Sequence, residues 1–122
     1  GGSATASTPD CRLMNQRQMF DEAASQLDLD GDQRASLLVL HVDPYLEWLK
    51  TGKGLEISRR RLMEITETLK LLAYVFNGDS DRARQWLYSR ETTMRPKIPA
   101  AVLRVGKVGE VRDHVENMMG FT

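Results

Sequence analysis

The sequence predicts an all-α fold, and three observations support this prediction. Apolar residues recur at spacings of three and four along most of the chain, which is the period of a helix with one buried face. Residues that cap helices, such as Asn, Asp and Ser, stand before these apolar runs. No stretch reads convincingly as a strand. The 122 residues, of which 41% are hydrophobic and 28% charged, suffice for one domain or for two small helical lobes that share a core.

The first two helices are expected on either side of an acidic turn. Asn15 can cap the first helix, and Gln18, three residues later, completes a capping box. One face of this helix then carries Met19, Ala23, Ala24 and Leu27. The segment 28–32 ends it, and a second helix is expected at about 32–40.

A third helix follows a short turn. Asp43 is expected to cap it, with Pro44 at the first helical position, where the missing N–H costs nothing. Leu46 and Leu49 are expected to face the core, and Gly52 to end the helix.

The longest helix is expected from its cap Ser58 to about Phe76. Its apolar stripe consists of Leu62, Ile65, Leu69, Leu72, Ala73 and Phe76. Further apolar residues make its second half apolar nearly all round: Met63, Leu71, Tyr74 and Val75. Such a helix either lies at the centre of the fold or is covered by a second subunit. We expect a homodimer, because a monomer rarely exposes so large an apolar patch.

Three shorter helices are expected in the remainder. Asp79 or Ser80 can cap the first of them, which runs to about Tyr88. Its inward residues are expected to be Ala83, Trp86 and Leu87. Residues 89–99 are expected to be irregular, because two prolines break helices there.

A short helix led by Pro99 is expected to end near Gly106. The last helix, which Gly120 ends, carries apolar residues spaced three and four apart: Val108, Val111, Val115 and Met118.

These elements predict a chain in three parts. Residues 1–14 form a flexible polar tail, residues 15–57 a helix-turn-helix-like domain, and residues 58–122 the long helix with a small C-terminal half. Up to residue 57 there are nine acids and five bases, and twelve bases and eight acids follow. The first half is therefore net negative and the second net positive, although the whole chain is neutral.

Composition and motifs argue against several classes. A single Cys11 cannot form an internal disulfide, which fits a reducing compartment. No apolar run approaches the ~20 residues of a membrane span, and the start is too polar for a signal peptide. We therefore expect a cytoplasmic protein without membrane contact. Neither a catalytic motif nor a Gly-rich phosphate loop is present, so we expect no enzyme and no cofactor.

Metal motifs are incomplete. Residues 28–32 alternate acids as the start of a calcium loop does, but the twelfth position, which needs a bidentate Glu, is Val39. We expect Asp30 or Asp32 to cap the second helix instead. The two histidines lie far apart in sequence, so no zinc site is predicted.

The second and third helices have the proportions of a helix-turn-helix, whose second helix enters the major groove of DNA. The residues expected to contact DNA are Tyr45, Lys50, Arg59 and Arg60. The acidic character of this half opposes phosphate binding, which supplies most non-specific affinity. The alternative is that these helices only pack against the core.

The second half of the chain resembles a known family. Residues 79–87 read Asp-Ser-Asp-Arg-Ala-Arg-Gln-Trp-Leu, and residues 95–106 begin with Arg-Pro-Lys-Ile-Pro and end with Leu-Arg-Val-Gly. An Ala-x-x-Trp-Leu stretch, a Pro-led short helix ending in Leu-x-x-Gly and a terminal helix follow in this order in the toxin-binding domain of Xre/MbcA/ParS-type antitoxins. Residues 27–76 are similar to the divergent helix-turn-helix and long helix of that family.

The resemblance implies an antitoxin of a type II toxin-antitoxin system. Its partner would be a RES-domain toxin, an enzyme that consumes NAD, whose active-site entrance the antitoxin's C-terminal region covers. The pair would also repress its own operon by binding operator DNA. The alternative function is a helix-turn-helix transcriptional regulator that acts mainly by DNA binding.

We expect the toxin-facing surface to combine an apolar tip with bases. The tip consists of Met118, Met119 and Phe121, which lie so near the end of the chain that little backbone follows to bury them. The bases, which would complement acidic groups of the partner, are Arg95, Lys97, Arg104, Lys107 and Arg112.

Overall fold

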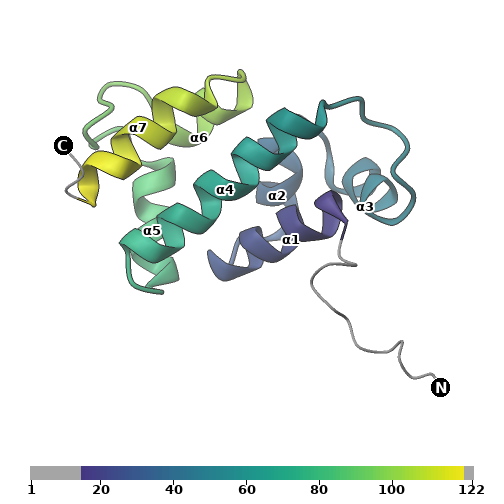
Figure 1. Ribbon diagram of the computed structural model, residues 1–122, viewed down its shortest axis with the longest axis horizontal. Coiled ribbons are helices and arrows are strands. Elements are labelled where there is room, and N and C mark those ends of the chain that lie inside the picture. The colour runs from purple at the N-terminus through teal and green to yellow at the C-terminus, as the bar shows by residue number, and fades with distance from the viewer. Residues whose placement is uncertain (1–14, 120–122) are drawn as a thin grey trace.

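The computed structural model describes residues 15–119, and within that range its regular secondary structure is entirely helical. The helices are α1 Gln16–Gln26, α2 Gly31–Leu37, α3 Val42–Thr51, α4 Arg59–Val75, α5 Ser80–Tyr88, α6 Pro99–Arg104 and α7 Val108–Met118 (Figure 1). The all-α prediction is therefore confirmed. The predicted tail and Gly120 lie outside the described residues.

Side-chain caps start several helices where the sequence predicts them. At α1, the Asn15 side chain accepts a hydrogen bond from the Gln18 N–H at 2.9 Å, and the Gln18 side chain accepts one in return from the Asn15 N–H at 3.3 Å. Asp30 and Gln33 form the same reciprocal pair at α2, at 2.7 and 3.0 Å. Single caps at α4 and α5 come from Ser58 and Asp79. These bonds satisfy N–H groups that have no partner within the helix.

The boundaries of α2 and α3 differ from the prediction. α2 ends earlier, at Leu37, because a residue with a left-handed backbone, φ 59°, follows two positions later. α3 begins at Val42, and the side chain of His41 at its cap position makes no capping bond. Asp43 and Pro44 therefore lie within the first turn. Pro44 is tolerated there because an N–H at that point has no helical acceptor.

The buried face of α3 is rotated from the predicted one. Tyr45 and Trp48 are buried, whereas Leu46 is 51% exposed and Leu49 is only partly buried. The centroid of the Tyr45 ring lies 6.2 Å from that of Phe20 in α1 and 5.9 Å from that of Trp48. Burial of large aromatic rings outweighs that of leucine side chains. The prediction that Leu46 faces the core is therefore wrong.

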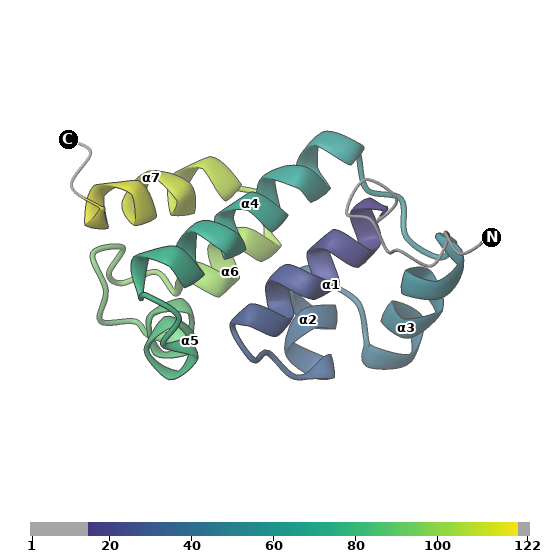
Figure 2. The same cartoon turned by 60° about the horizontal axis from the view of Figure 1, so that its bottom comes forward.

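α4 runs between α1 and α7 and is the central helix of the fold (Figures 1 and 2). The apolar residues that it buries are Leu62, Ile65, Leu69 and Leu72. Two threonines on the same helix are also buried, Thr66 and Thr68, and their hydroxyls donate to carbonyl oxygens one turn earlier at 2.8 Å. Buried residues from all seven helices join one continuous core around α4.

The apolar second half of α4 is largely covered by the chain itself. Leu71, Ala73 and Val75 are partly buried against the core, and only Tyr74, at 72% exposure, stands clear of it. Of the two arrangements expected for this helix, the structure has the central one. The homodimer stays a prediction, and these residues no longer require it.

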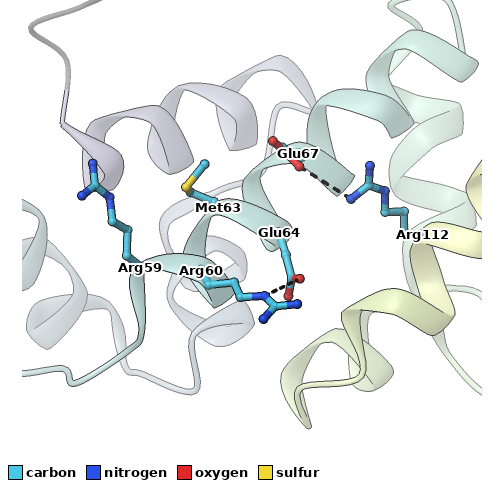
Figure 3. A pocket seen from close by; sticks show the side chains of 6 residues that line it. All are labelled: Arg59, Arg60, Met63, Glu64, Glu67 and Arg112. Carbon is cyan, nitrogen blue, oxygen red and sulfur yellow. Dashed lines mark ion pairs between the residues drawn. The ribbon is translucent and has the colours of Figure 1, made fainter.

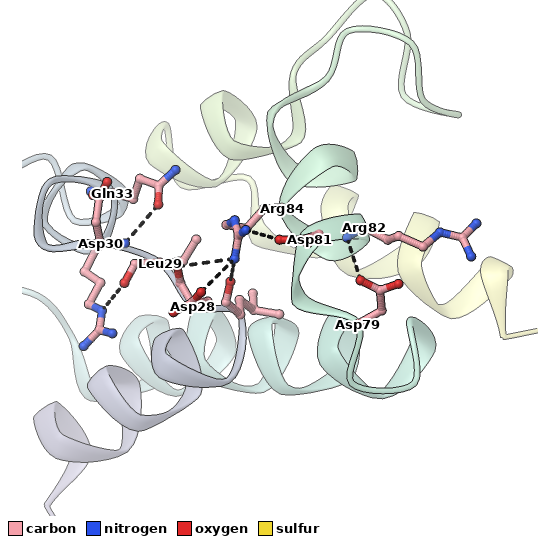
Figure 4. Close-up of polar contacts among 10 residues, drawn as sticks. Asp28, Leu29, Asp30, Gln33, Asp79, Asp81, Arg82 and Arg84 are labelled. Atoms are coloured by element: carbon pink, nitrogen blue, oxygen red, sulfur yellow. Dashed lines mark hydrogen bonds and ion pairs between the residues drawn. The ribbon is translucent and has the colours of Figure 1, made fainter.

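Arg84 links α5 to the end of α1 (Figure 4). Its guanidinium donates to the carbonyl oxygen of Leu27, the C-cap residue of α1, at 2.9 Å and forms an ion pair with the Asp28 carboxylate at 3.5 Å. Asp81 holds the other side of the guanidinium. The acidic turn at residues 28–32 thus serves as a helix cap and an arginine partner.

We predict that Trp86→Ala strongly destabilises the chain. Trp86 is 9% exposed and belongs to the same core as α4, α6 and α7. Truncating a buried Trp typically costs about 3–5 kcal/mol, which is a large part of the stability of a small domain. Urea unfolding of the variant should show this loss, with Tyr74→Ala as the exposed control. A midpoint equal to that of the parent chain would contradict the placement of Trp86.

Candidate functional site

The turn between α6 and α7 exposes an apolar surface. Pro99 occupies the first position of α6, where its fixed φ suits the helix. Val102 and Leu103 are buried, but Val105 follows them at the end of the helix and is 70% exposed. Gly106 then reverses the chain with φ +90°, a left-handed conformation that favours glycine.

A shallow hollow of about 250 Å³ lies on this surface, and we call it the α6 hollow. Its lining consists of Lys97, Ile98, Ala101, Val102, Val105, Lys107 and Glu110. The Lys97 ammonium forms an ion pair with the Glu110 carboxylate of α7 at 3.1 Å. The result is an aliphatic surface with two lysines and one carboxylate at its edge.

The structure divides the predicted toxin-facing residues among different surfaces. Lys97 and Lys107 border the α6 hollow, and Arg104 is exposed at the end of α6. Arg95 lies in the segment before α6 and forms a long ion pair of 3.8 Å with Glu91.

Arg112 borders a second hollow, of about 440 Å³, between α4 and α7 (Figure 3). Its lining consists of Arg59, Arg60, Met63, Glu64, Glu67 and Arg112. Arg112 pairs across it with Glu67 at 3.6 Å, and Arg60 pairs with Glu64 at 3.5 Å. A residue predicted to face the toxin thus shares a surface with two residues predicted to face DNA.

Met118 and Met119 border a third hollow, of about 320 Å³, with Tyr74, Val75 and Asn77. Both methionines are partly buried, and Met118 packs against the core. Met118 is thus part of a docked helix, not of a projecting tip. Phe121 lies outside the described residues.

The residues predicted to contact DNA are also divided. Lys50, Arg59 and Arg60 are exposed on α3 and at the start of α4. Tyr45 is 1% exposed, and its hydroxyl donates to the Asp21 carboxylate at 2.6 Å. The prediction that Tyr45 points outward is wrong, because the aromatic face of α3 packs on α1.

Tyr45 belongs to a polar group at the edge of the core. Arg34 of α2 donates to the same Asp21 oxygen at 3.0 Å and to the carbonyl oxygen of Leu29 at 2.9 Å. Burial raises the pKa of Tyr45 above its usual value, and the hydrogen bond to Asp21 raises it further. The neutral hydroxyl is therefore strongly favoured in the folded chain.

The aliphatic part of the α6 hollow is the feature that sequence reasoning missed. Val105 directly precedes Gly106 and stands three residues after the buried Val102. α6 ends at Arg104, so Val105 lies just outside the helix and does not continue its buried face. In the sequence, the glycine at position 106 marks this helix end and is the signal for the exposure of Val105.

Comparison of the chain with family models, with curated proteins and with solved structures finds no match. In residues 15–119, no group of three or more His, Cys, Asp or Glu side chains is arranged to hold a metal ion. Among the helices of this range, none combines the length and the apolar character needed to cross a membrane.

We predict that Tyr45→Phe reduces the loss of stability at alkaline pH. The pKa of Tyr45 is higher in the folded than in the unfolded chain, so its contribution is fully present below about pH 10 and is lost as pH rises above that value. The variant should lose about 1–2 kcal/mol at neutral pH through the missing hydrogen bond. Above about pH 10, its stability should fall less steeply than that of the parent.

Urea unfolding at several pH values measures this difference. Tyr74→Phe, which removes the hydroxyl of an exposed tyrosine, is the matched control. Equal alkaline slopes for Tyr45→Phe and the parent chain would contradict the assignment.

Proposed function

We propose that the chain is an antitoxin that binds and blocks a RES-type NAD-consuming toxin through its C-terminal half, without catalysis of its own. The order of elements supports this proposal. α5 contains Trp86, α6 begins at Pro99 and is followed by Gly106, and α7 comes next. These are the elements on which the resemblance to Xre/MbcA/ParS-type antitoxins rests.

The α6 hollow is the observation that carries the proposal. Exposed Val105 and its aliphatic neighbours offer apolar area to a partner, which is the main source of binding free energy. The edge carries two lysines and the Glu110 carboxylate, so its net positive charge favours a partner with acidic groups around an apolar projection. Such rim charges mainly raise the association rate. In this proposal the toxin presents such a surface near the entrance of its active site.

A test begins with the neighbouring reading frames, one of which should encode a RES-domain toxin. That toxin should copurify with the chain, and its NAD consumption should stop when the chain is added. A neighbouring RES toxin that consumes NAD at an unchanged rate would contradict the proposal.

We predict that Val105→Glu weakens inhibition of NAD consumption at least about tenfold, because it places a charge at the centre of the apolar contact. Val105 is exposed, so the melting temperature should barely change. Leu46→Glu is the matched control, since it makes the same kind of change at an exposed leucine of α3. Equal inhibition by both variants would remove the α6 hollow from the interface.

Repression of the operon is the second candidate function, either with the toxin or alone as a helix-turn-helix regulator. Three exposed bases favour it: Lys50, Arg59 and Arg60. They lie at the end of α3 and the start of α4, next to the expected recognition helix, where they could contact DNA phosphates. In this proposal α2 and α3 form the helix-turn-helix, and Tyr45 makes no contact with DNA because it is buried. Any such binding should depend mostly on phosphate contacts.

We predict that Arg59→Ala combined with Arg60→Ala lowers the salt dependence of operator binding. The slope of log affinity against log salt should fall by roughly 2, because two phosphate contacts are lost. Fluorescence anisotropy over a range of salt concentrations measures the slope. If the slope is the same as in the parent chain, neither arginine contacts phosphate.

A further inference from the structure

The outer side of α4 carries a ridge of three exposed residues, which we call the Met63 ridge. Arg59, Met63 and Glu67 follow one another at intervals of four, so they lie on one face of the helix (Figure 3). Met63 is 40% exposed, and the side chain of Glu67 is 54% exposed. An exposed methionine thus stands between a base and an acid, each about 6 Å away along the helix axis.

Hollows lie on both sides of this ridge. The hollow toward α7 is the one of about 440 Å³ that Arg112 borders. Toward α1, a smaller hollow of about 60 Å³ is lined by Gln16, Met19, Met63, Thr66, Glu67 and Lys70. A ridge between two grooves is the shape that packs against another helix of the same kind.

We propose that the Met63 ridge is a self-association surface on which a second copy of this chain docks by an antiparallel, two-fold contact. With the axis at Met63, Arg59 of one copy lies opposite Glu67 of the other, and the same pair forms again on the far side of the axis. Each pair brings a base of one copy next to an acid of the other, and the two Met63 side chains are in contact between the pairs. Such a contact uses the same surface patch on both subunits, as two-fold dimers do.

The charge pattern selects this arrangement among the possible ones. A parallel contact would place Arg59 against Arg59 and Glu67 against Glu67, which is repulsive. The ion pairs within one chain on this surface are long, at 3.5 and 3.6 Å, and exposed, so they contribute little and can exchange partners at little cost. The Met63 ridge shares no residue with the α6 hollow.

Charge reversal tests the proposal in a way that is specific to two-fold pairing. Arg59→Glu and Glu67→Arg should each place like charges opposite one another and raise the dissociation constant of the dimer about tenfold or more. An equimolar mixture of the two variants should associate again, because each copy then carries the charges that its partner needs. Sedimentation equilibrium at low salt, where exposed charges are least screened, measures all three samples.

Arg82→Glu is the matched control, since it reverses an exposed arginine on α5 and should leave association unchanged. Melting temperatures check that each variant is folded; an acid in the first turn of α4 is favourable there. The proposal is overturned if the parent chain is monomeric at tens of micromolar, if the reversals leave its dimer intact, or if the mixture stays monomeric. A monomeric parent whose Arg59→Glu variant loses DNA would instead assign the ridge to nucleic acid.

Discussion

Burial of α4 on two sides is the constraint on which the rest of the structure depends. α1 packs against one side of this helix and α7 against another, and Leu62, Ile65, Leu69 and Leu72 supply the common core. The N-terminal helices and the C-terminal helices therefore meet mainly through α4. Its remaining side faces away from both neighbours, which is why the Met63 ridge is exposed. The hollows on both sides of this ridge follow from the same packing arrangement.

Arginine side chains reinforce this arrangement by binding carbonyl oxygens of other elements. Arg17 of α1 donates to Leu49 at the end of α3 at 3.3 Å, and Arg84 of α5 donates to Leu27 at the end of α1 at 2.9 Å. Arg61 of α4 reaches the carbonyl oxygen of Arg104 at 3.4 Å. The last carbonyls of a helix have no N–H partner within it, so these bonds satisfy groups that would otherwise need water. Part of the basic charge counted in the sequence is thus used within the fold and is not offered to a partner.

The sequence predicts local features well, but it predicts poorly which residues of different helices lie together on one surface. The capping box at Asn15, the Ser58 cap and the buried stripe of α4 depend on residues within a few positions of one another, so the pattern contains them. The face of α3 depends on Phe20 and Asp21 of α1, which decide that Tyr45 is buried and Leu46 exposed. The expected grouping of Arg112 with Lys97 and Met118 also fails, because α7 borders a different neighbour along each part of its length.

The central place of α4 also has a consequence for synthesis on the ribosome. α1 to α3 precede α4 along the chain, so its contact with α1 can form as soon as α4 emerges. The side of α4 that packs against α7 must wait for Val111 and Val115, which are buried only in the finished fold. At typical elongation rates this apolar side stays open for a few seconds. During that interval the apolar side of α4 is open to chaperones and to other unfolded chains.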